Sequence, residues 1–327
     1  MLVKKIKDRL PLEFTKSIDL MTEQMGFPLD FSANLDDIRI GFSAARDQSI
    51  EAGMAIKHVI KESHTAPWPD GSHDIPLFIY RPENQTKPLP VVYWIHGGGL
   101  VVGVAEQDEA MLKAWVNEFN CVAVSVEYRL APDYPFPVPL EDCSVVLEHI
   151  FNNADALQID PERIVLGGGS AGGGLAAALA QKTCDEGKIK ISHQLLCYPM
   201  LDCKNQSKAA ADVDDTYIWS RDNNYFGWKS YLGDDPVTID PPKYASAPHH
   251  HDLRNLPPAS ILVGDIDLFA QEDIAYAARL SAAGIPTALH VYPGGVHGFE
   301  GVNQKAGITK EFIRTRDLLL KTALGGK

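Results

Sequence analysis

Cysteine is scarce in this chain, and its few occurrences follow no recognised pattern. Five cysteines occur among 327 residues, and no two are spaced as a C-x-x-C pair. An odd number at irregular spacing argues against a disulfide framework and against a cysteine-based zinc site. We therefore expect a cytoplasmic protein that works without a metal or cofactor.

Positive charge and long apolar runs are also in short supply. The chain has 30 Lys and Arg residues against 43 Asp and Glu residues, a formal net charge of −13. Nucleic-acid binding requires clustered basic residues, so we expect no nucleic-acid partner. Near the N-terminus, Asp8, Arg9 and Glu13 interrupt any apolar stretch, and we expect neither an export signal nor a membrane span.

Apolar runs of strand length alternate with helical patterns through most of the chain. The runs predict strands at 56–61, 75–80, 91–95, 121–128, 163–167, 193–198, 259–264 and 287–292. From residue 91 onward, helical patterns lie between most of these runs, at 106–119, 140–151, 171–186, 271–283 and 308–324. This alternation predicts an α/β protein whose mostly parallel sheet is covered by helices on both faces.

Two segments depart from the alternation. Residues 1–50 carry two amphipathic helical stripes, and residues 203–250 hold polar turns and a group of aromatic residues but no buried strand. Insertions after the strands of an α/β sheet commonly cover the ligand site. We therefore predict N-terminal cap helices at 1–50, a core at 51–202 and 251–327, and a cap insertion at 203–250. For the N-terminal helices, plain packing against the core is the alternative to a cap.

A strand, a glycine-rich turn and a helix meet around Ser170. Residues 163–174 are R-I-V-L-G-G-G-S-A-G-G-G, so Gly168 and Gly172 stand two residues on either side of the serine. This G-x-S-x-G spacing is typical of a nucleophilic serine held on a strained strand-to-helix turn. The N–H of Ala171, at the start of the helix, would face the negative charge that develops on an attacked carbonyl oxygen.

A second glycine cluster follows the strand at 91–95. It is His96-Gly97-Gly98-Gly99, the H-G-G-G loop that supplies further oxyanion donors in lipases and esterases. We interpret His96 as a residue that shapes this loop. Asp267 and His297 follow Ser170 in the order serine, acid, base.

With these motifs and the segment Y-R-L-A-P-D-Y-P-F-P at 128–137, the chain resembles the hormone-sensitive lipase-like branch of the α/β-hydrolases over roughly residues 75–300. The resemblance implies an eight-stranded α/β-hydrolase core with a helical cap. It also implies hydrolysis of short to medium acyl-chain esters without a cofactor. This chain departs from the family at Gly169, where Asp, Glu or Thr is usual, and at 268–272, where L-F-A-Q-E replaces P-L-x-D-E.

The resemblance also assigns roles to the site residues. Ser170 becomes the nucleophile, His297 the base that takes its proton, and Asp267 the acid that orients the imidazole. The oxyanion hole would consist of the N–H groups of Gly98, Gly99 and Ala171. Asp265 is the other candidate for the acid, and we choose Asp267 because the strand at 260–264 should end just before it.

The sequence offers fewer signals for the substrate contacts and the oligomeric state than for the catalytic residues. We expect a small-molecule ester to contact Met21, Met25, Trp219 and Phe226 in the cap. Some relatives dimerise through the last strand, here 287–292, so the resemblance implies a possible homodimer. Two other functions stay open: a non-catalytic small-molecule receptor on the same fold, and an amidase, deacetylase or lactonase with the same triad.

Three consecutive histidines invite a metal-site hypothesis. Adjacent residues point in different directions, and His249, His250 and His251 stand in a proline-rich stretch. We therefore predict a solvated turn here in preference to a metal site.

Overall fold

An eight-stranded sheet forms the centre of the protein, with the strands in the order β1-β2-β4-β3-β5-β6-β7-β8. The computed structural model describes residues 9–25, 29–205, 218–250 and 252–325. β1 pairs antiparallel with β2, and β2 with β4, whereas the other pairs are parallel. The strands are β1 (Val59–Pro67), β2 (Asp74–Pro82), β3 (Leu89–Ile95), β4 (Val122–Val126), β5 (Ile159–Gly169), β6 (His193–Cys197), β7 (Ala259–Gly264) and β8 (Thr287–Tyr292).

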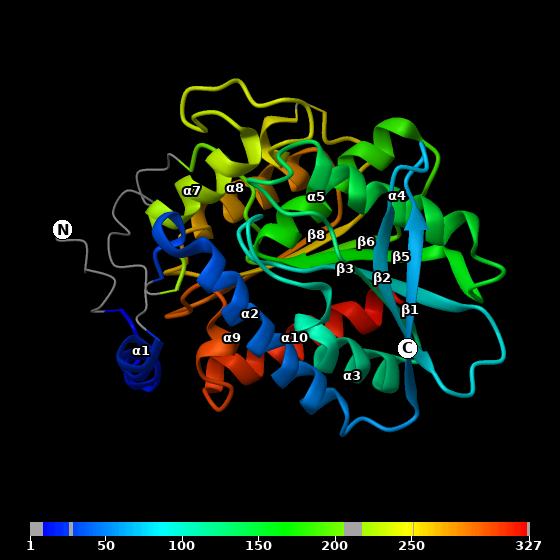
Figure 1. The fold of residues 1–327 in the computed structure, drawn as a ribbon, viewed down its shortest axis with the longest axis horizontal. Coiled ribbons are helices and arrows are strands. Elements are labelled where there is room, and N and C mark those ends of the chain that lie inside the picture. Colours follow the sequence, from blue (N-terminus) through cyan, green and yellow to red (C-terminus); the bar gives the residue numbers. More distant parts are fainter. Residues whose placement is uncertain (1–8, 26–28, 206–217, 251, 326–327) are drawn as a thin grey trace.

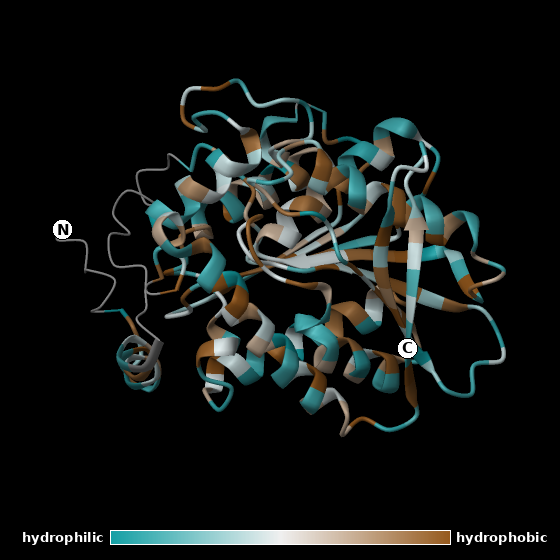
Figure 2. Ribbon diagram, in the orientation of Figure 1, coloured by the Kyte–Doolittle hydropathy of each residue, from teal (hydrophilic) through white to brown (hydrophobic). Residues whose placement is uncertain are grey.

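Helices cover both faces of the sheet (Figure 1). One face carries α3 (Glu109–Phe119), α9 (Phe299–Val302) and α10 (Gly307–Ala323). The other carries α4 (Val138–Asn152), α5 (Ala171–Glu186) and α8 (Ala270–Ala282). Figure 2 shows hydrophilic and hydrophobic bands alternating along these helices, as expected for helices with one buried side.

The sheet separates two hydrophobic clusters, because alternate side chains of each strand point to opposite faces. Along β3, Val91, Tyr93 and Ile95 belong to one hydrophobic cluster. Val92 and Trp94, which point the opposite way, belong to the second. Every residue of β3 and β7 is buried, as expected for parallel strands covered on both faces.

The segments predicted as cap lie in two places. α2 (Phe31–Gly53) packs against α3 and the short helix η2 (Ala105–Asp108), and its start meets α7 (Arg221–Leu232). Asn223 on α7 accepts the N–H of Phe31 at 3.3 Å and donates to the Leu29 carbonyl at 2.7 Å. α1 (Leu12–Met25) packs instead on α9, where Phe14 meets Phe299 with ring centroids 6.2 Å apart.

Some predicted boundaries were wrong. β1 covers Val59–Pro67 rather than 56–61, because this edge strand has one fully buried residue and an irregular exposure pattern that gives little periodic signal. The region 203–250 contains α7 and the short helix η3 (Ala247–His249), neither of which we predicted. No helix within the described residues is long and apolar enough to cross a membrane.

Candidate active site

Ser170 occupies the turn between β5 and α5 in strained backbone geometry. Its φ and ψ are 55° and −122°, a region that residues with a side chain seldom adopt. Its N–H donates to the Cys197 carbonyl at 2.9 Å, and its carbonyl accepts from the N–H groups of Met200 at 2.9 Å and Gly174 at 3.1 Å. These backbone bonds offset the strain and hold the side chain at the carboxyl edge of the sheet.

The glycines around Ser170 are required by close approach of backbones. A Cβ atom on Gly168 would overlap the backbone of Gly172, and one on Gly172 would overlap the carbonyl oxygen of Ile95. Gly169 differs, because a Cβ there would lie 3.6 Å from the Tyr198 ring, an ordinary contact. The departure from the family at Gly169 therefore reflects no steric need.

The side chains of Ser170, His297 and Asp267 form a continuous hydrogen-bonded chain. His297 Nε2 lies 2.9 Å from Ser170 Oγ, and His297 Nδ1 lies 2.8 Å from Asp267 Oδ2. A carboxylate can only accept, so Nδ1 carries the proton and Nε2 is left to accept from the serine hydroxyl. The second oxygen of Asp267 accepts the N–H of Phe269 at 2.9 Å, and the carboxylate is fully buried.

Two other acids near Asp267 have separate partners. Asp265 accepts the Gly294 N–H at 2.6 Å and pairs with Arg9. Glu272 accepts the N–H groups of Leu201 and Asp202 and the side chain of Asn205, and so ties α8 to the loop after β6. Neither acid forms a hydrogen bond with His297. The geometry favours Asp267 over Asp265 as the residue that orients the imidazole.

Aromatic rings enclose His297. Tyr198 and Phe269 each approach it edge-on with centroids 5.0 Å away, and Trp219 lies at 6.5 Å. Only 9% of the histidine surface is exposed. Exclusion of water strengthens the hydrogen bonds that the imidazole makes.

The H-G-G-G loop lies beside Ser170 with two glycines in the left-handed region. Gly98 has φ of 128° and Gly99 has φ of 59°. No described residue accepts a hydrogen bond from the N–H of either glycine, and both line the same cavity as Ser170. A Cβ on Gly99 would overlap the Trp219 ring, which adds a steric reason for glycine at that position.

His96 is part of the loop's support. It is fully buried, stacks on Tyr128 at 4.2 Å, and its Nδ1 lies 2.8 Å from the Gly97 carbonyl. Burial lowers the pKa of His96 to about 4, so the ring is neutral at physiological pH. These contacts agree with the structural role expected from the sequence.

A cavity of about 400 Å³ opens above Ser170. Of the four residues predicted to contact substrate, Trp219 lines it. Phe226 packs against the hydrophobic core instead, and Met21 lies on α1, away from the lining. The side chain of Met25 falls outside the described residues.

Sequence reasoning missed several lining residues. Phe31 and Phe42 come from α2, Met111 from α3 and Tyr198 from the turn after β6. Phe42 lies on a predicted amphipathic stripe, and Tyr198 directly follows a strand that points at the site, so both carried a detectable signal. The lining also includes Asp108, Glu300 and Arg316, for which no motif exists.

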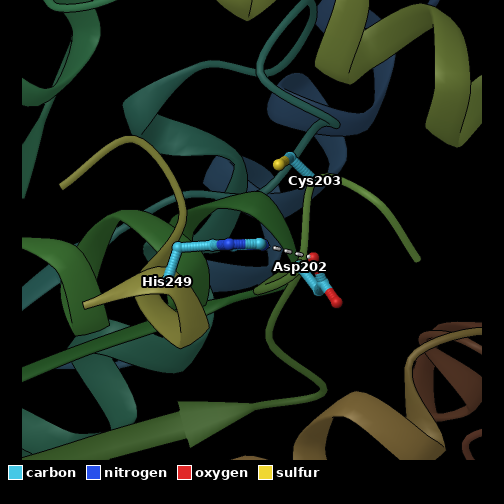
Figure 3. Close-up of side chains that lie close together, drawn as sticks. All are labelled: Asp202, Cys203 and His249. Carbon is cyan, nitrogen blue, oxygen red and sulfur yellow. Dashed lines mark hydrogen bonds and ion pairs between the residues drawn. The ribbon is translucent and has the colours of Figure 1, made fainter. Parts of the chain in front are cut away.

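One group of side chains outside the cavity has metal-ligating atoms within 4.8 Å of one another: Asp202, Cys203 and His249 (Figure 3). His249 Nε2 lies 3.0 Å from Asp202 Oδ1, so an ordinary polar contact joins their two loops. Burial raises the pKa of the Cys203 thiol to about 11, which disfavours the thiolate that a metal requires.

The expected solvated turn is wrong for His250. Its side chain is 8% exposed and stacks on Tyr244 at 5.6 Å. His251 lies outside the described residues. Packing of the loop against Tyr244 could not be inferred from three adjacent histidines.

Comparison with known proteins supports the fold and the family. A family model described as the alpha/beta hydrolase fold matches residues 92–301. The chain is 32% identical to carboxylesterase NlhH of Mycobacterium tuberculosis over 84% of this chain and 85% of that one. It is 33% identical to an arylesterase of Saccharolobus solfataricus over 70% of this chain and 74% of that one.

Solved structures agree. A bacterial heroin esterase superposes with a TM-score of 0.89 at 33% identity, covering 97% of this chain and 98% of the other. Esterase LipW from Mycobacterium marinum superposes with a TM-score of 0.83 at 28% identity, covering 97% of this chain and 96% of the other. Together with the sheet order and the strained serine turn, these matches establish that the chain belongs to the hormone-sensitive lipase-like α/β-hydrolases.

Proposed function

We propose that this protein is a serine carboxylesterase that hydrolyses short to medium acyl-chain esters through an acyl-enzyme. The observation that carries the proposal is the hydrogen-bonded chain from Ser170 through His297 to Asp267, in which Ser170 and His297 line the cavity. The ester hydrolases among the similar proteins support the same reaction class.

In the first half-reaction, Ser170 Oγ attacks the ester carbonyl carbon while His297 Nε2 takes the hydroxyl proton. The N–H groups of Gly98, Gly99 and Ala171 hold the resulting oxyanion, and loss of one such donor typically costs about 2.7–4 kcal/mol in the barrier. The intermediate collapses, the alkoxide leaves with the proton from His297, and the acyl group remains on Ser170.

In the second half-reaction, water attacks the acyl carbonyl and gives its proton to His297. Collapse of the second intermediate releases the carboxylic acid and returns the proton to Ser170. Asp267 stabilises the imidazolium in both halves and keeps the proton on Nδ1 between them.

The size and lining of the cavity support the acyl-chain preference. A volume of about 400 Å³ stands near the lower end of small-molecule sites, which span roughly 300–1,000 Å³. Phe31, Phe42 and Trp219 offer apolar surface to an acyl chain. We assign Trp219 the role of a substrate contact and expect it to pack against bound ester.

The experiment is a series of p-nitrophenyl esters of rising acyl length, with p-nitroanilides of the same acids as amide controls. We expect kcat/KM to be highest within roughly C2 to C8 and the anilides to be slow. Faster anilide hydrolysis would favour an amidase. Tight ester binding without turnover would favour the receptor alternative.

A homodimer through β8 is a second part of the proposal. β8 ends the sheet, pairs only with β7 among the described strands, and leaves 36% of Leu289 and 38% of Val291 exposed. An unpaired edge of this kind can pair with another chain. The cytoplasmic location stays a prediction from the cysteine content.

A further inference from the structure

The lining of the cavity above Ser170 contains two groups of side chains of different chemistry, which we call its apolar wall and its charged wall. One is apolar and includes Phe31, Phe42 and Trp219. The other comes from η2, α9 and α10 and carries Asp108, Glu300 and Arg316. Hydrolysis of a simple alkyl ester needs no charged wall, so these residues call for a separate role.

The charges on this wall do not balance. Arg316 Nε donates to Asp317 Oδ1 at 2.9 Å, Nη2 forms an ion pair with the same oxygen at 2.9 Å, and the guanidinium lies 5.0 Å from the centre of the Trp115 ring. Its positive charge is therefore matched by Asp317. Asp108 and Glu300 form no ion pair with any described residue, which leaves two carboxyl groups in the cavity wall without a bonded cation.

Among the described residues, one neutral side chain donates to each acid. Trp94 Nε1 donates to Asp108 Oδ2 at 2.8 Å, and the Tyr198 hydroxyl donates to Glu300 Oε1. Glu300 Oε2 is buried and accepts no hydrogen bond from any described residue. Burial of a carboxylate oxygen without a donor costs free energy, and a ligand that donates to Glu300 would lower this cost.

The pKa shifts of the two acids point the same way. Burial raises the pKa of Asp108 to about 6, although the Trp94 bond and the nearby Arg316 oppose the rise. Burial likewise raises the pKa of Glu300 against the Tyr198 bond and Arg316. A cation bound between them would relieve this cost of desolvation.

We propose that Asp108 and Glu300 make the enzyme selective for esters that carry a protonated amine. The ammonium group would donate to the carboxylates while the apolar remainder of the substrate packs on the apolar wall. The Trp94 and Trp219 rings that border the same cavity offer additional cation–π contact. This proposal rests on the esterase function proposed above.

The test compares esters of the same shape that differ in charge. The first pair is 2-(dimethylamino)ethyl acetate and 3-methylbutyl acetate, with the amine in the alcohol. The second is ethyl 4-(dimethylamino)butanoate and ethyl 5-methylhexanoate, with the amine in the acyl part. At neutral pH the measured quantity is the ratio of kcat/KM for the amine ester to that for the neutral ester, in each pair.

In the Asp108→Asn/Glu300→Gln double variant, we expect this ratio to fall at least about tenfold in one of the two pairs. The fall should come mainly from a higher KM for the amine ester. A hydrogen bond to a charged group typically contributes enough free energy to account for a tenfold change in affinity or more. The matched control is Asp155→Asn/Glu311→Gln, which removes the same charge from exposed positions. An unchanged ratio in both pairs would overturn the proposal. Faster hydrolysis of monoethyl succinate than of its neutral analogues would overturn it too, because Arg316 would then set the preference.

A binding measurement separates this proposal from the esterase proposal. In the Ser170→Ala variant, calorimetry with the same pairs gives Kd without turnover. Tighter binding of the amine ester, lost in the triple variant with Asp108→Asn and Glu300→Gln, supports the ammonium site even if the wild-type protein hydrolyses none of the esters. Equal Kd values within both pairs would refute it even if all four esters are hydrolysed.

Discussion

Asp267→Asn should reduce kcat by about 10³ to 10⁴ while the protein still folds. The reason lies in the two bonds of the carboxylate: one oxygen accepts the Phe269 N–H at 2.9 Å, and the other meets His297 Nδ1 at 2.8 Å. An asparagine keeps its amide oxygen on the Phe269 N–H, since the reverse orientation leaves two donors facing each other. Its NH₂ group then donates to Nδ1, which moves the ring proton to Nε2 and prevents acceptance from Ser170.

The magnitude follows from two effects. Turning the amide round costs about 1–3 kcal/mol for the unsatisfied N–H of Phe269, so the population of the productive tautomer falls roughly 5- to 150-fold. Loss of the negative charge beside the imidazolium adds the rest, and in a serine protease the equivalent change lowers kcat about 10⁴-fold. The assay is kcat on p-nitrophenyl butyrate, with circular dichroism to verify folding.

The matched control is Asp265→Asn, two residues earlier in the same loop. Asp265 bonds Gly294 and Arg9 and does not contact His297, so its loss should change kcat far less. Glu272→Gln and Asp273→Asn should likewise lose much less than Asp267→Asn. Full activity in Asp267→Asn together with a large loss in Asp265→Asn would refute the assignment of the acid.

Three further changes test other parts of the structure. The pKa of Asp108 is about 6 in the folded protein against an ordinary 3.8, so its contribution to stability falls as pH rises between these values. Asp108→Asn should therefore raise the unfolding free energy by up to about 3 kcal/mol at pH 7 and by almost nothing below pH 4, as measured by urea denaturation; an equal gain at both pH values would contradict this. Phe42→Ala should extend the preferred acyl chain by enlarging the cavity, and an unchanged optimum in the p-nitrophenyl series would mean that Phe42 does not contact substrate. Val291→Lys should convert a β8-mediated dimer to monomer in sedimentation, because lysine discourages edge pairing; a wild-type monomer would remove the dimer proposal.

The sequence predicted the parts of this protein whose local chemistry is distinctive. The buried runs of β3 and β7, and Gly168 and Gly172 on either side of Ser170, each have one physical explanation, so the sheet and the strained turn could be anticipated. The choice of Asp267 depended on where β7 ends, and that strand does end at Gly264.

The remaining features depend on tertiary contacts that the sequence does not contain. Asp108 and Glu300 are separated by most of the chain and carry no motif, yet η2 and α9 bring them to one cavity. Phe226 on α7 comes seven residues after Trp219, which lines the cavity, yet it packs against the hydrophobic core. The sequence of this aromatic segment does not indicate which of its residues lines the cavity.

The most direct test of the central claim is to identify the nucleophile with a covalent inhibitor. The protein is mixed with a p-nitrophenyl phosphonate, which serine hydrolases retain as a stable adduct, and the intact mass and the labelled peptide are measured. We predict one adduct per chain on Ser170, complete loss of esterase activity, and no labelling or activity in Ser170→Ala. Esterase activity that survives in Ser170→Ala, or a label on another residue that accounts for the inhibition, would contradict the account.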